Sequence, residues 1–548
     1  MAKKSRHPSN KRPSSQPVPG LAALLQQAAA LAQQSQFQPA AHLYQQILQR
    51  WPDQPEALHA LGLILHQSGN SEGALQLVGR AALIQPDNAA IHSNLGALLA
   101  GRGQTQAAMA SYRRALQLDP ALIQAHCNLA NLLAGELQLE EAATHYRQAI
   151  QRAPAYAEAH SYLGNLLMEE GKLAEAEASC LQAVLLRPDL PAAHNNLGAV
   201  YRRWGKAWEA AAHYRQALAL QPNFAEAHYN LALVLLQLGQ FKPGWIEYEW
   251  RWRLASFAGV DPGFAQPRWD GSDPSGRTIL LWAEQGLGDT IQFIRYAALL
   301  RARGARVLFR GPIALYPLLA GRPEIASLID PQGPLPLFDL HAPLMSLPYL
   351  CRTELKTIPA PGPYLEVPAT CGLSAQLQQQ LTAKRGALKV GLVWSPKLFT
   401  PRHFSELGNA LNNSERYCAL KHFEPLLALA NIQFFSLYKG ERLGELEPYR
   451  ERIVDLGSHF QDFGDTAWAI DKLDLVITVD TAVAHLAGAL SKPVWILLPH
   501  LADWRWLAAR SDSPWYPAAR LFRQPTPGDW SAVVAQVIAA MQDGSIPR

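Results

Sequence analysis

The sequence predicts an α-helical solenoid followed by an α/β region with parallel sheets. Beyond residue 277, short apolar, β-branched runs alternate with helix-like segments, which is typical of βαβ units. The chain of 548 residues is too long for one hydrophobic core, so several domains are expected. In the first half, prolines recur at a constant step of 34 residues, at Pro52, Pro86, Pro120, Pro154, Pro188 and Pro222.

A constant step of 34 residues is the signature of the tetratricopeptide repeat, in which each unit is a pair of antiparallel helices. Small residues recur at the same step inside the first helix and allow close helix packing, at Gly96, Ala130, Gly164, Gly198 and Ala232. We predict about seven repeats over residues 21–256, a linker over 257–276, and two α/β lobes over 277–385 and 386–548.

Two polar residue types also follow the repeat. Histidines stand at His92, His126, His160, His194 and His228. Equivalent atoms in adjacent repeats lie about 10 Å apart and metal ligands need about 2 Å, so packing or hydrogen bonding is the favoured interpretation. The asparagines admit two interpretations, because a carboxamide can bind an extended polypeptide or tie one repeat to the next. The spacing resembles the asparagine ladder of O-GlcNAc transferases, and the predicted peptide groove comprises Asn94, Asn128, Asn196 and Asn230.

Charge and hydropathy exclude several classes of protein. The net charge is +4, and residues 1–20 contain basic side chains without an acid, which predicts a disordered basic tail. The remainder is nearly neutral, so no nucleic acid is expected as a partner. No apolar run reaches the length of a membrane span or resembles a signal peptide, so a cytoplasmic protein is expected. The five cysteines lack the spacing of a zinc site, and neither a metal nor a cofactor is expected.

The stretch from Leu473 to Pro499 reads as strand, turn, helix and strand. Asp480, Thr481 and His485 would then lie at the carboxyl end of a parallel strand, where ligands bind and helix N–H groups attract phosphate. The alternative is that Thr481 only caps the helix and His485 is a core histidine.

A second turn, "AEQGLGDTIQF", follows a predicted strand at Thr278–Trp282 and opens a helix to about Ala302. Asp289 is either a first-turn acid favoured by the helix dipole or a functional carboxylate. The turn lacks the third glycine of the dinucleotide fingerprint. Glu284, Gln285, Gly286 and Gly288 belong to the same turn.

Both turns resemble those of the heptosyltransferase-like glycosyltransferases, enzymes of the GT-B fold with two Rossmann-like lobes. The resemblance implies that Asp289 deprotonates the acceptor, and that Asp339, His341 and Ser346 contact the acceptor from a loop. Residues 396–419 show little periodic structure and are expected to form a loop. The family has a shorter loop here that ends in a basic residue facing the donor diphosphate; Arg416 occupies that place, and Lys397, Arg402 and His403 are alternatives nearby. The donor-binding residues implied on the second lobe are Ser395, Arg416, Lys439, Glu441, Asp480, Thr481 and His485.

Two positions, Glu441 and Ala482, bear on what the resemblance implies. A solvated loop would equally explain Glu441. Lipopolysaccharide heptosyltransferases usually have glycine after the Asp-Thr pair, where this chain has Ala482, so the donor is not assumed to be ADP-heptose. We therefore expect a metal-independent glycosyltransferase that takes a nucleotide sugar and an acceptor, protein or glycan, recruited by the repeats. The alternative is a non-catalytic scaffold with a degenerate transferase-like domain.

Overall fold

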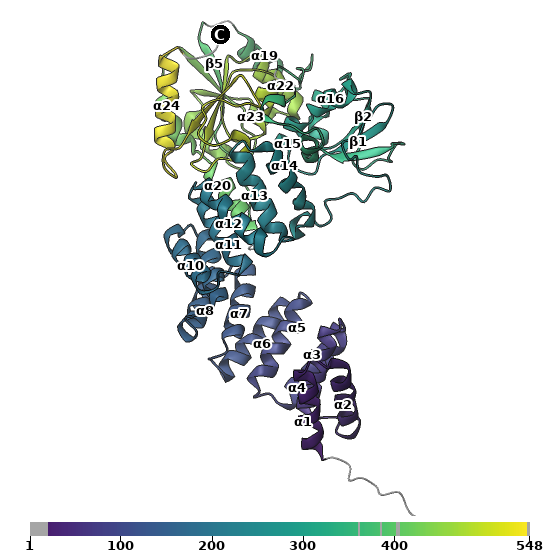
Figure 1. Ribbon diagram of the computed structural model, residues 1–548. Helices are drawn as coiled ribbons and strands as arrows, with labels where there is room; N and C mark the ends of the chain where they lie inside the picture. Colours follow the sequence, from purple (N-terminus) through teal and green to yellow (C-terminus); the bar gives the residue numbers. More distant parts are fainter. Residues whose placement is uncertain (1–19, 360–361, 384–385, 402–405, 545–548) are drawn as a thin grey trace, which may run out of the picture. The chain divides into compact units, whose positions relative to one another are not determined.

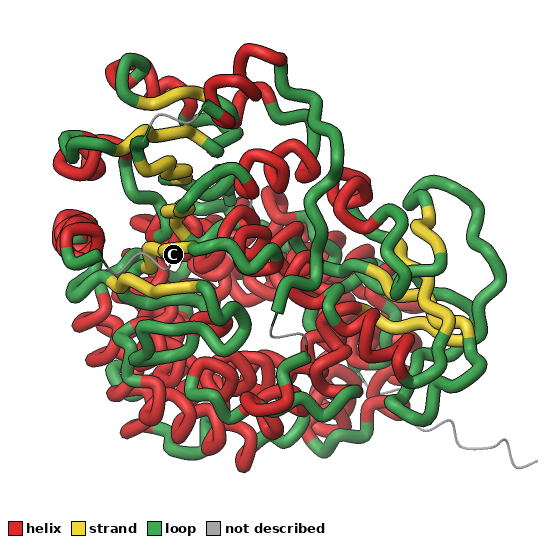
Figure 2. The backbone as a smooth tube through the Cα atoms, turned by 90° about the horizontal axis from the view of Figure 1, so that it is seen from above, coloured by secondary structure: helices red, strands yellow, loops and turns green. Residues whose placement is uncertain are grey.

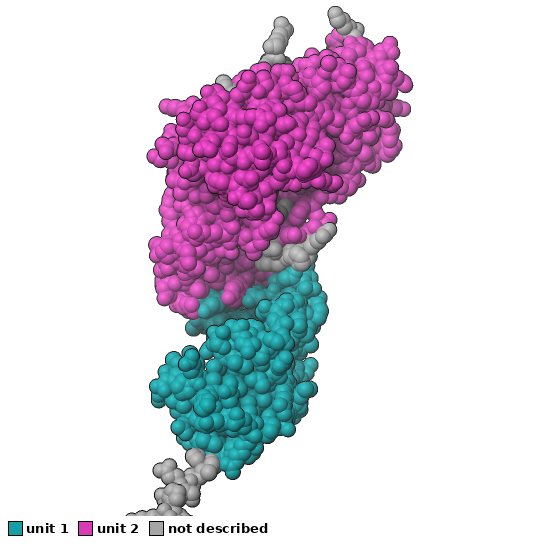
Figure 3. Space-filling model, turned by 90° about the vertical axis from the view of Figure 1, so that its right-hand side faces the viewer, with its two compact units in different colours: residues 1–159 teal, residues 160–548 magenta. Residues whose placement is uncertain are grey.

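The computed structural model describes residues 20–359, 362–383, 386–401 and 406–544. The predicted basic tail over residues 1–20 lies outside this part apart from Gly20, as do Arg402 and His403. The chain divides into two compact units, Met1–Ala159 and His160–Arg548, which are coloured separately in Figure 3. Each unit is considered by itself.

Helices occur in consecutive pairs along residues 21–248, and the predicted run of about seven repeats is confirmed (Figure 1). In the described part of the first unit the helices are α1 (Leu21–Gln33), α2 (Phe37–Arg50), α3 (Pro55–Gln67), α4 (Ser71–Ile84), α5 (Ala89–Gly101), α6 (Thr105–Leu118), α7 (Ile123–Gly135) and α8 (Leu139–Arg152). The run continues with α9 (Ala157–Glu169), α10 (Leu173–Leu186), α11 (Pro191–Arg203), α12 (Ala207–Leu220), α13 (Ala225–Gln237) and α14 (Phe241–Tyr248).

The turn inside each pair has a constant geometry. Its first helix ends before a residue with positive φ, a conformation that glycine adopts without steric cost. Glycine occupies this place at Gly69, Gly103, Gly171, Gly205 and Gly239, with φ between 72° and 87°. Leu137 occupies it in the fourth pair with φ 61°, and Ser35 in the first with φ 60°.

Substitution of Leu137 by glycine is expected to stabilise the protein. A non-glycine residue in the left-handed region costs about 1–2 kcal/mol, and the extra freedom of glycine in the unfolded chain offsets part of the gain. We expect a net gain of about 0.5–1 kcal/mol, measured as a higher urea midpoint of the full chain. The matched variant Gly103→Ala should lower the midpoint, and a lower midpoint for Leu137→Gly would contradict the strain argument.

The histidine ladder serves the loops between repeats. In four repeats a ring nitrogen, Nε2, lies within hydrogen-bonding distance of a proline carbonyl oxygen six residues earlier. The pairs are His92–Pro86 (3.0 Å), His126–Pro120 (3.1 Å), His194–Pro188 (3.0 Å) and His228–Pro222 (2.9 Å). Hydrogen bonding to the backbone of the loops therefore accounts for these four histidines.

Two parallel sheets lie in the second unit, and Figure 2 shows their strands in two groups. The first sheet has the order β3-β2-β1-β4, with β1 (Thr278–Trp282), β2 (Arg306–Arg310), β3 (Ser327–Ile329) and β4 (Leu340–Pro343). The second has the order β10-β9-β8-β5-β6-β7, with β5 (Leu388–Val393), β6 (Ile432–Ser436), β7 (Ile453–Asp455), β8 (Leu475–Val479), β9 (Val494–Leu498) and β10 (Ala519–Arg523).

Strand order reverses once in each sheet, between β1 and β4 and between β5 and β8. In open parallel sheets, ligands bind beyond the carboxyl ends of the strands at such a reversal. The helices that follow β1 and β8 are α15 (Leu287–Phe293) and α23 (Ala482–Ala489), and they pack against each other. The helix predicted from Asp289 to Ala302 is divided into α15 and α16 (Tyr296–Ala302).

Two expectations about loops were wrong. Asp339, His341 and Ser346 were expected on a loop, but His341 lies in β4, which pairs in parallel with β1 from Ile279↔Leu340 to Trp282↔Pro343. The prolines of this segment hid the strand signal in the sequence. Residues 396–419 contain a helix, α20 (Leu407–Glu415), whose polar composition gives no periodic pattern.

The last repeat and the α/β region share one hydrophobic core. Trp245 of α14 packs edge-on against Phe293 of α15 and against Trp504, with centroid distances of 6.4 and 5.3 Å. Arg251, which is fully buried, pairs with Glu284 at 3.2 Å. The α-helical and α/β parts of the second unit therefore pack as one body.

None of the helices within the described residues is long and apolar enough to cross a membrane.

Candidate functional site

A cavity of about 1110 Å³ lies in the second unit at the carboxyl ends of strands from both sheets. The turn after β1 supplies residues 285–289, and the segments after β5, β6, β8 and β9 supply most of the remaining wall. A further part comes from the repeats, through Arg202 of α11 and the α13 residues Tyr229, Leu233 and Gln237. Three parts of the chain that are distant in sequence therefore enclose one space.

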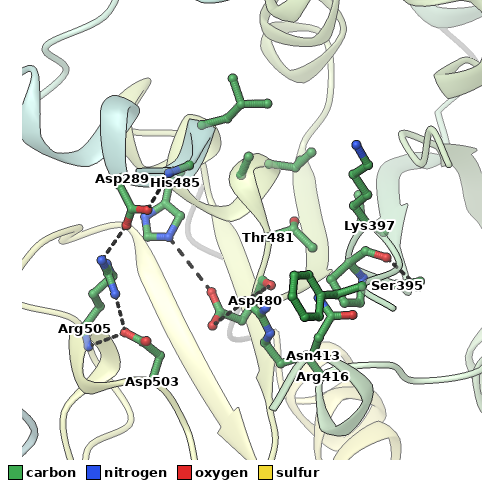
Figure 4. Close-up of a pocket in the computed structure, with 18 of the residues that line it drawn as sticks. Asp289, Ser395, Lys397, Asn413, Arg416, Asp480, Thr481, His485, Asp503 and Arg505 are labelled. Carbon is green, nitrogen blue, oxygen red and sulfur yellow. Dashed lines mark hydrogen bonds and ion pairs between the residues drawn. The ribbon is translucent and has the colours of Figure 1, made fainter. Parts of the chain in front are cut away.

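Most of the predicted site residues line this cavity. They are Gln285, Gly286, Gly288, Asp289, Ser395, Arg416, Lys439, Glu441, Asp480, Thr481 and His485. Figure 4 shows Asp289 and His485 close together, with Asp480 and Thr481 between them and Ser395, Lys397 and Arg416. The cavity thus brings together the two turns that the sequence singled out.

The glycines of the first turn allow two helices to approach. A Cβ atom on Gly288 would lie 2.8 Å from Cδ2 of His485 on α23, which is too close for a real contact. The N–H of Gly286 donates to Oδ2 of Asp289 at 3.0 Å and fixes the carboxylate at the start of α15. The glycine turn therefore holds Asp289 beside the second lobe.

Gly288→Ala is expected to destabilise the protein by about 1–3 kcal/mol, because the added methyl group overpacks the contact between α15 and α23. Gly286→Ala is the matched control, since its Cβ would meet only Oδ2 of Asp289, at 3.4 Å. Thermal denaturation of both variants measures the difference. Equal melting temperatures would contradict the proposed role of Gly288.

Arg505 connects Asp289 with another acidic residue that lines the cavity. Its guanidinium group pairs with Oδ1 of Asp289 and, at 2.8 Å, with Oδ1 of Asp503. Burial opposes the charge of Arg505, but the two carboxylates raise its pKa above the ordinary value. Asp289 is therefore an ion-paired carboxylate, held at one oxygen by a backbone N–H and at the other by a cation.

The environment of His485 keeps the imidazole neutral. Burial, assisted by the charge of Arg505, lowers the pKa of His485 to about 3. Its ring stacks on Trp506 at 5.1 Å, Nδ1 lies 2.9 Å from the hydroxyl oxygen of Tyr516, and Nε2 lies 4.0 Å from Oδ1 of Asp480. These contacts are those of a core histidine, which was the alternative interpretation of the sequence. The ring of His485 nevertheless also lines the cavity.

The charge of Asp480 is partly balanced by Arg416. Burial raises the pKa of Asp480, and the nearby Arg416, whose Nη1 is 3.5 Å from Oδ2, opposes this shift. Two more cations, Lys397 and Lys439, line the same side of the cavity. The side of the cavity formed by the second sheet therefore carries Lys397, Arg416 and Lys439 together with the carboxylates of Glu441, Asp462 and Asp480.

The hydroxyl groups nearby make local contacts. Ser395 donates to the carbonyl oxygen of Pro396 at 2.9 Å, and Oγ1 of Thr481 lies 3.0 Å from Oγ1 of Thr478. The side chain of Thr481 makes no capping hydrogen bond to α23. Glu441 accepts a hydrogen bond of 3.5 Å from the N–H of Leu398.

Asp339 and Ser346, which were expected to contact the acceptor, do not line the cavity, and neither do the predicted acceptor-side residues Glu284 and His341. Glu284 is buried against Arg251 and accepts from the N–H of Met345 at 3.0 Å; burial raises its pKa to about 7 against the opposing effect of Arg251. His341 is buried in β4, where Nδ1 accepts from Nε1 of Trp282 at 3.1 Å. Both Glu284 and His341 stabilise the first lobe instead of contacting the cavity, because pairing with distant segments turns them inward.

The asparagine ladder forms hydrogen bonds within the repeats. The amide nitrogen of Asn94 lies 2.8 Å from Nε2 of His59. The amide of Asn196 donates to Oγ of Ser161 at 3.0 Å, and the amide of Asn230 donates to Oδ1 of Asn195 at 3.2 Å. The amide of Asn128 donates to the hydroxyl of Tyr112 at 3.2 Å. In the first three the partner lies 35 residues earlier, in the preceding repeat. These nitrogens therefore tie repeats together, and polypeptide binding by the same side chains stays a prediction.

The sequence analysis missed Arg505, Asp503 and the contribution of the repeats. Arg505 and Asp503 follow β9, whose carboxyl end lies at the same edge of the sheet as that of β8. The rule that ligands bind beyond the carboxyl ends of parallel strands could have indicated them. The repeat residues gave no local signal, because their place depends on how α11 and α13 pack on the α/β part.

The structure shows no group of three or more His, Cys, Asp or Glu side chains arranged to hold a metal ion among the residues it describes.

Comparisons with known proteins identify the repeats. Family models described as TPR repeat match residues 99–135, 138–171 and 203–239, and models described as tetratricopeptide repeat match residues 31–98 and 157–190. The chain therefore contains tetratricopeptide repeats, which are typical of protein–protein interaction modules. Over 344 residues, 57% of the chain, it is 26% identical to Protein FlbA of Caulobacter vibrioides, and it spans about half (54%) of the length of that relative.

Solved structures similar to this chain include a thermophilic TPR protein of Thermus thermophilus, with 25% identity over 33% of this chain and 99% of that chain and a TM-score of 0.30. YrrB, described as a TPR protein with an unusual peptide-binding site, is 19% identical over 34% of this chain and 96% of its own, with a TM-score of 0.30. The type IV pilus biogenesis factor PilW is 21% identical over 38% and 98%, with a TM-score of 0.35.

Proposed function

We propose that this chain is a glycosyltransferase that moves a sugar from a nucleotide-sugar donor to a polypeptide acceptor. In this proposal the two α/β parts are the two lobes of a GT-B fold. The observation that supports it most is the single cavity in which Asp289 of one lobe faces the cations and Asp480 of the other. Tetratricopeptide repeats, which are typical of protein–protein interaction modules, line part of the same cavity and favour a polypeptide partner.

The donor would bind on the side of the second sheet. Lys397, Arg416 and Lys439 lie near the reversal between β5 and β8, where parallel sheets bind ligands. Cations beside a departing diphosphate stabilise the negative charge that develops on it. The N–H groups at the start of α23, next to Thr481, would add to this stabilisation.

The acceptor would bind on the side of α15. Its hydroxyl oxygen attacks the anomeric carbon, the bond from that carbon to the donor phosphate breaks, and Asp289 takes the hydroxyl proton. The nucleoside diphosphate leaves with the electron pair of the broken bond. A carboxylate is a far weaker base than an alkoxide, so we expect the proton to move as the new C–O bond forms and not before.

Release of nucleoside diphosphate from a panel of nucleotide sugars tests the proposal on the full chain. At least one donor should give release that depends on Asp289 and increases when a hydroxyl-bearing polypeptide is added. Equal background release by wild type and Asp289→Asn with every donor would favour the alternative function, a polypeptide-binding scaffold whose α/β part does not catalyse transfer. The ion pair between Asp289 and Arg505 is the observation that keeps this alternative open.

A further inference from the structure

The repeats contribute one continuous wall to the cavity. Tyr229, Leu233 and Gln237 are spaced by four residues on α13, so they lie on one face of the helix, and all three line the cavity. Tyr248 and Trp504 extend the same surface, with centroid distances of 5.7 Å from Tyr229 to Tyr248 and 6.4 Å from Tyr248 to Trp504. We call these five residues the repeat wall.

The repeat wall begins at the turn that carries Asp289. Nε2 of Gln285 donates to the hydroxyl of Tyr248 at 2.9 Å. Arg505, the ion-pair partner of Asp289, lies over the ring of Trp504 at 4.4 Å from its centroid. A group bound on this wall would therefore lie beside the proposed base, whereas Lys397 and Lys439 follow strands of the second sheet.

Hydrogen bonds between the repeats and the α/β part hold the repeat wall in place. The N–H of Ala508 donates to the carbonyl oxygen of Gln237 at 2.9 Å, and Nε2 of Gln237 donates to the carbonyl oxygen of Ala502 at 3.5 Å. Nearby, Arg203 of α11 pairs with Glu415 at 3.1 Å and donates to Asn412 at 2.7 Å on α20. The last two repeats are thus anchored to the second lobe by hydrogen bonds and an ion pair.

The chemistry of the wall differs from that of the donor side. Tyr229, Leu233 and Gln237 are partly exposed on α13, and the nearly buried rings of Tyr248 and Trp504 complete an uncharged, largely apolar lining. An apolar side chain that covers such a surface is removed from water, and this favours its binding. None of the five side chains is charged; the cations beside them are Arg202 of α11 and Arg505, which is paired with Asp289 and Asp503.

We propose that the repeat wall is a subsite for an apolar side chain of the acceptor polypeptide, close in sequence to the hydroxyl residue presented to Asp289. This inference rests on the proposed function. The last repeat would then both hold the acceptor and select its sequence. An extended chain on α13 would pass from the repeats to the base without leaving the protein surface.

Binding of labelled peptides to the full chain tests the subsite without a donor. Each peptide has one central Ser or Thr and carries Phe, Leu, Ala, Glu or Lys at one flanking position at a time, and fluorescence anisotropy measures its affinity. We expect Phe and Leu at one flanking position to bind roughly 10-fold or more tighter than Ala. Affinities that do not depend on the flanking residue would overturn the inference.

Leu233→Asn should remove this preference, and Leu233→Met should keep it because the side chain stays apolar. Leu218→Asn on α12 is the matched control: it alters a leucine that is also half-buried but does not line the cavity, and it should bind peptides as wild type does. A preference that survives Leu233→Asn in a folded protein contradicts the proposed subsite. Transfer to free oligosaccharides but to none of the peptides would contradict it as well.

Nucleotide release measured on the same samples separates the two proposals. Sequence-selective peptide binding that depends on Leu233, without release from any donor, would support the subsite and overturn glycosyl transfer. Release and transfer with no dependence on flanking residues would support glycosyl transfer and overturn the subsite.

Discussion

Asp289→Asn is expected to lower the rate of sugar transfer by about 10²–10⁴-fold, because general-base catalysis contributes a factor of that size. The substitution keeps the shape of the side chain and an oxygen that can accept from the N–H of Gly286, but it removes the group that takes the proton. Donor affinity should change little, since the proposed donor contacts lie on the second lobe. Initial rates of nucleotide release and equilibrium binding of the nucleotide measure the two effects separately.

Asp289→Asn also removes the ion pair with Arg505, so a control must separate this effect from the loss of the base. Asp503→Asn removes the other carboxylate that contacts Arg505 and leaves Asp289 in place. If Asp289 is the base, Asp503→Asn should retain far more activity than Asp289→Asn. Equal losses in both variants would indicate that the carboxylates serve to hold Arg505 and that the base lies elsewhere.

Periodic patterns in the sequence predicted the elements well. The 34-residue proline step gave the helix pairs, and apolar β-branched runs gave β1 at Thr278–Trp282 and the two strands, β8 and β9, of the stretch from Leu473 to Pro499. The reason is physical, since repeats and buried strands depend on local spacing of apolar residues. β4 and α20 were missed because prolines in one and polar residues in the other obscure that spacing.

The cavity was predicted less completely, because its walls come from contacts between distant segments. Asp289, Asp480 and His485 were identified because each follows a strand within a recognisable turn. Glu284 stands next to Gln285 in the same turn, yet it pairs with Arg251, which no local pattern connects to it. The repeat wall depends on the packing of α13 against residues 504–506 and has no signature in either segment alone.

Arg505→Leu is expected to destabilise the protein by about 2–4 kcal/mol. Breaking a buried ion pair costs about 3–5 kcal/mol because a charge is left without its partner, and the exposed fractions of Asp289 (22%) and Asp503 (36%) reduce that cost. The control Arg510→Leu breaks an arginine–aspartate pair of the same lobe whose partners are 37% and 66% exposed, and it should cost less than about 1 kcal/mol. Equal costs in urea denaturation would contradict the importance of the buried cluster.

The stabilisation of the fold by Arg505 is expected to depend on pH. Burial alone would raise the pKa of Asp503, but Arg505 holds it below the ordinary value in the folded protein. The stability that this carboxylate gains from Arg505 is therefore present above its unfolded pKa of about 3.9 and is lost as the pH falls through the folded value. The difference in unfolding free energy between wild type and Arg505→Leu should accordingly be largest near neutral pH and shrink in acid. A difference that stays constant down to pH values where the carboxylates are protonated would mean that Arg505 stabilises the fold by packing on Trp504 and not by its charge.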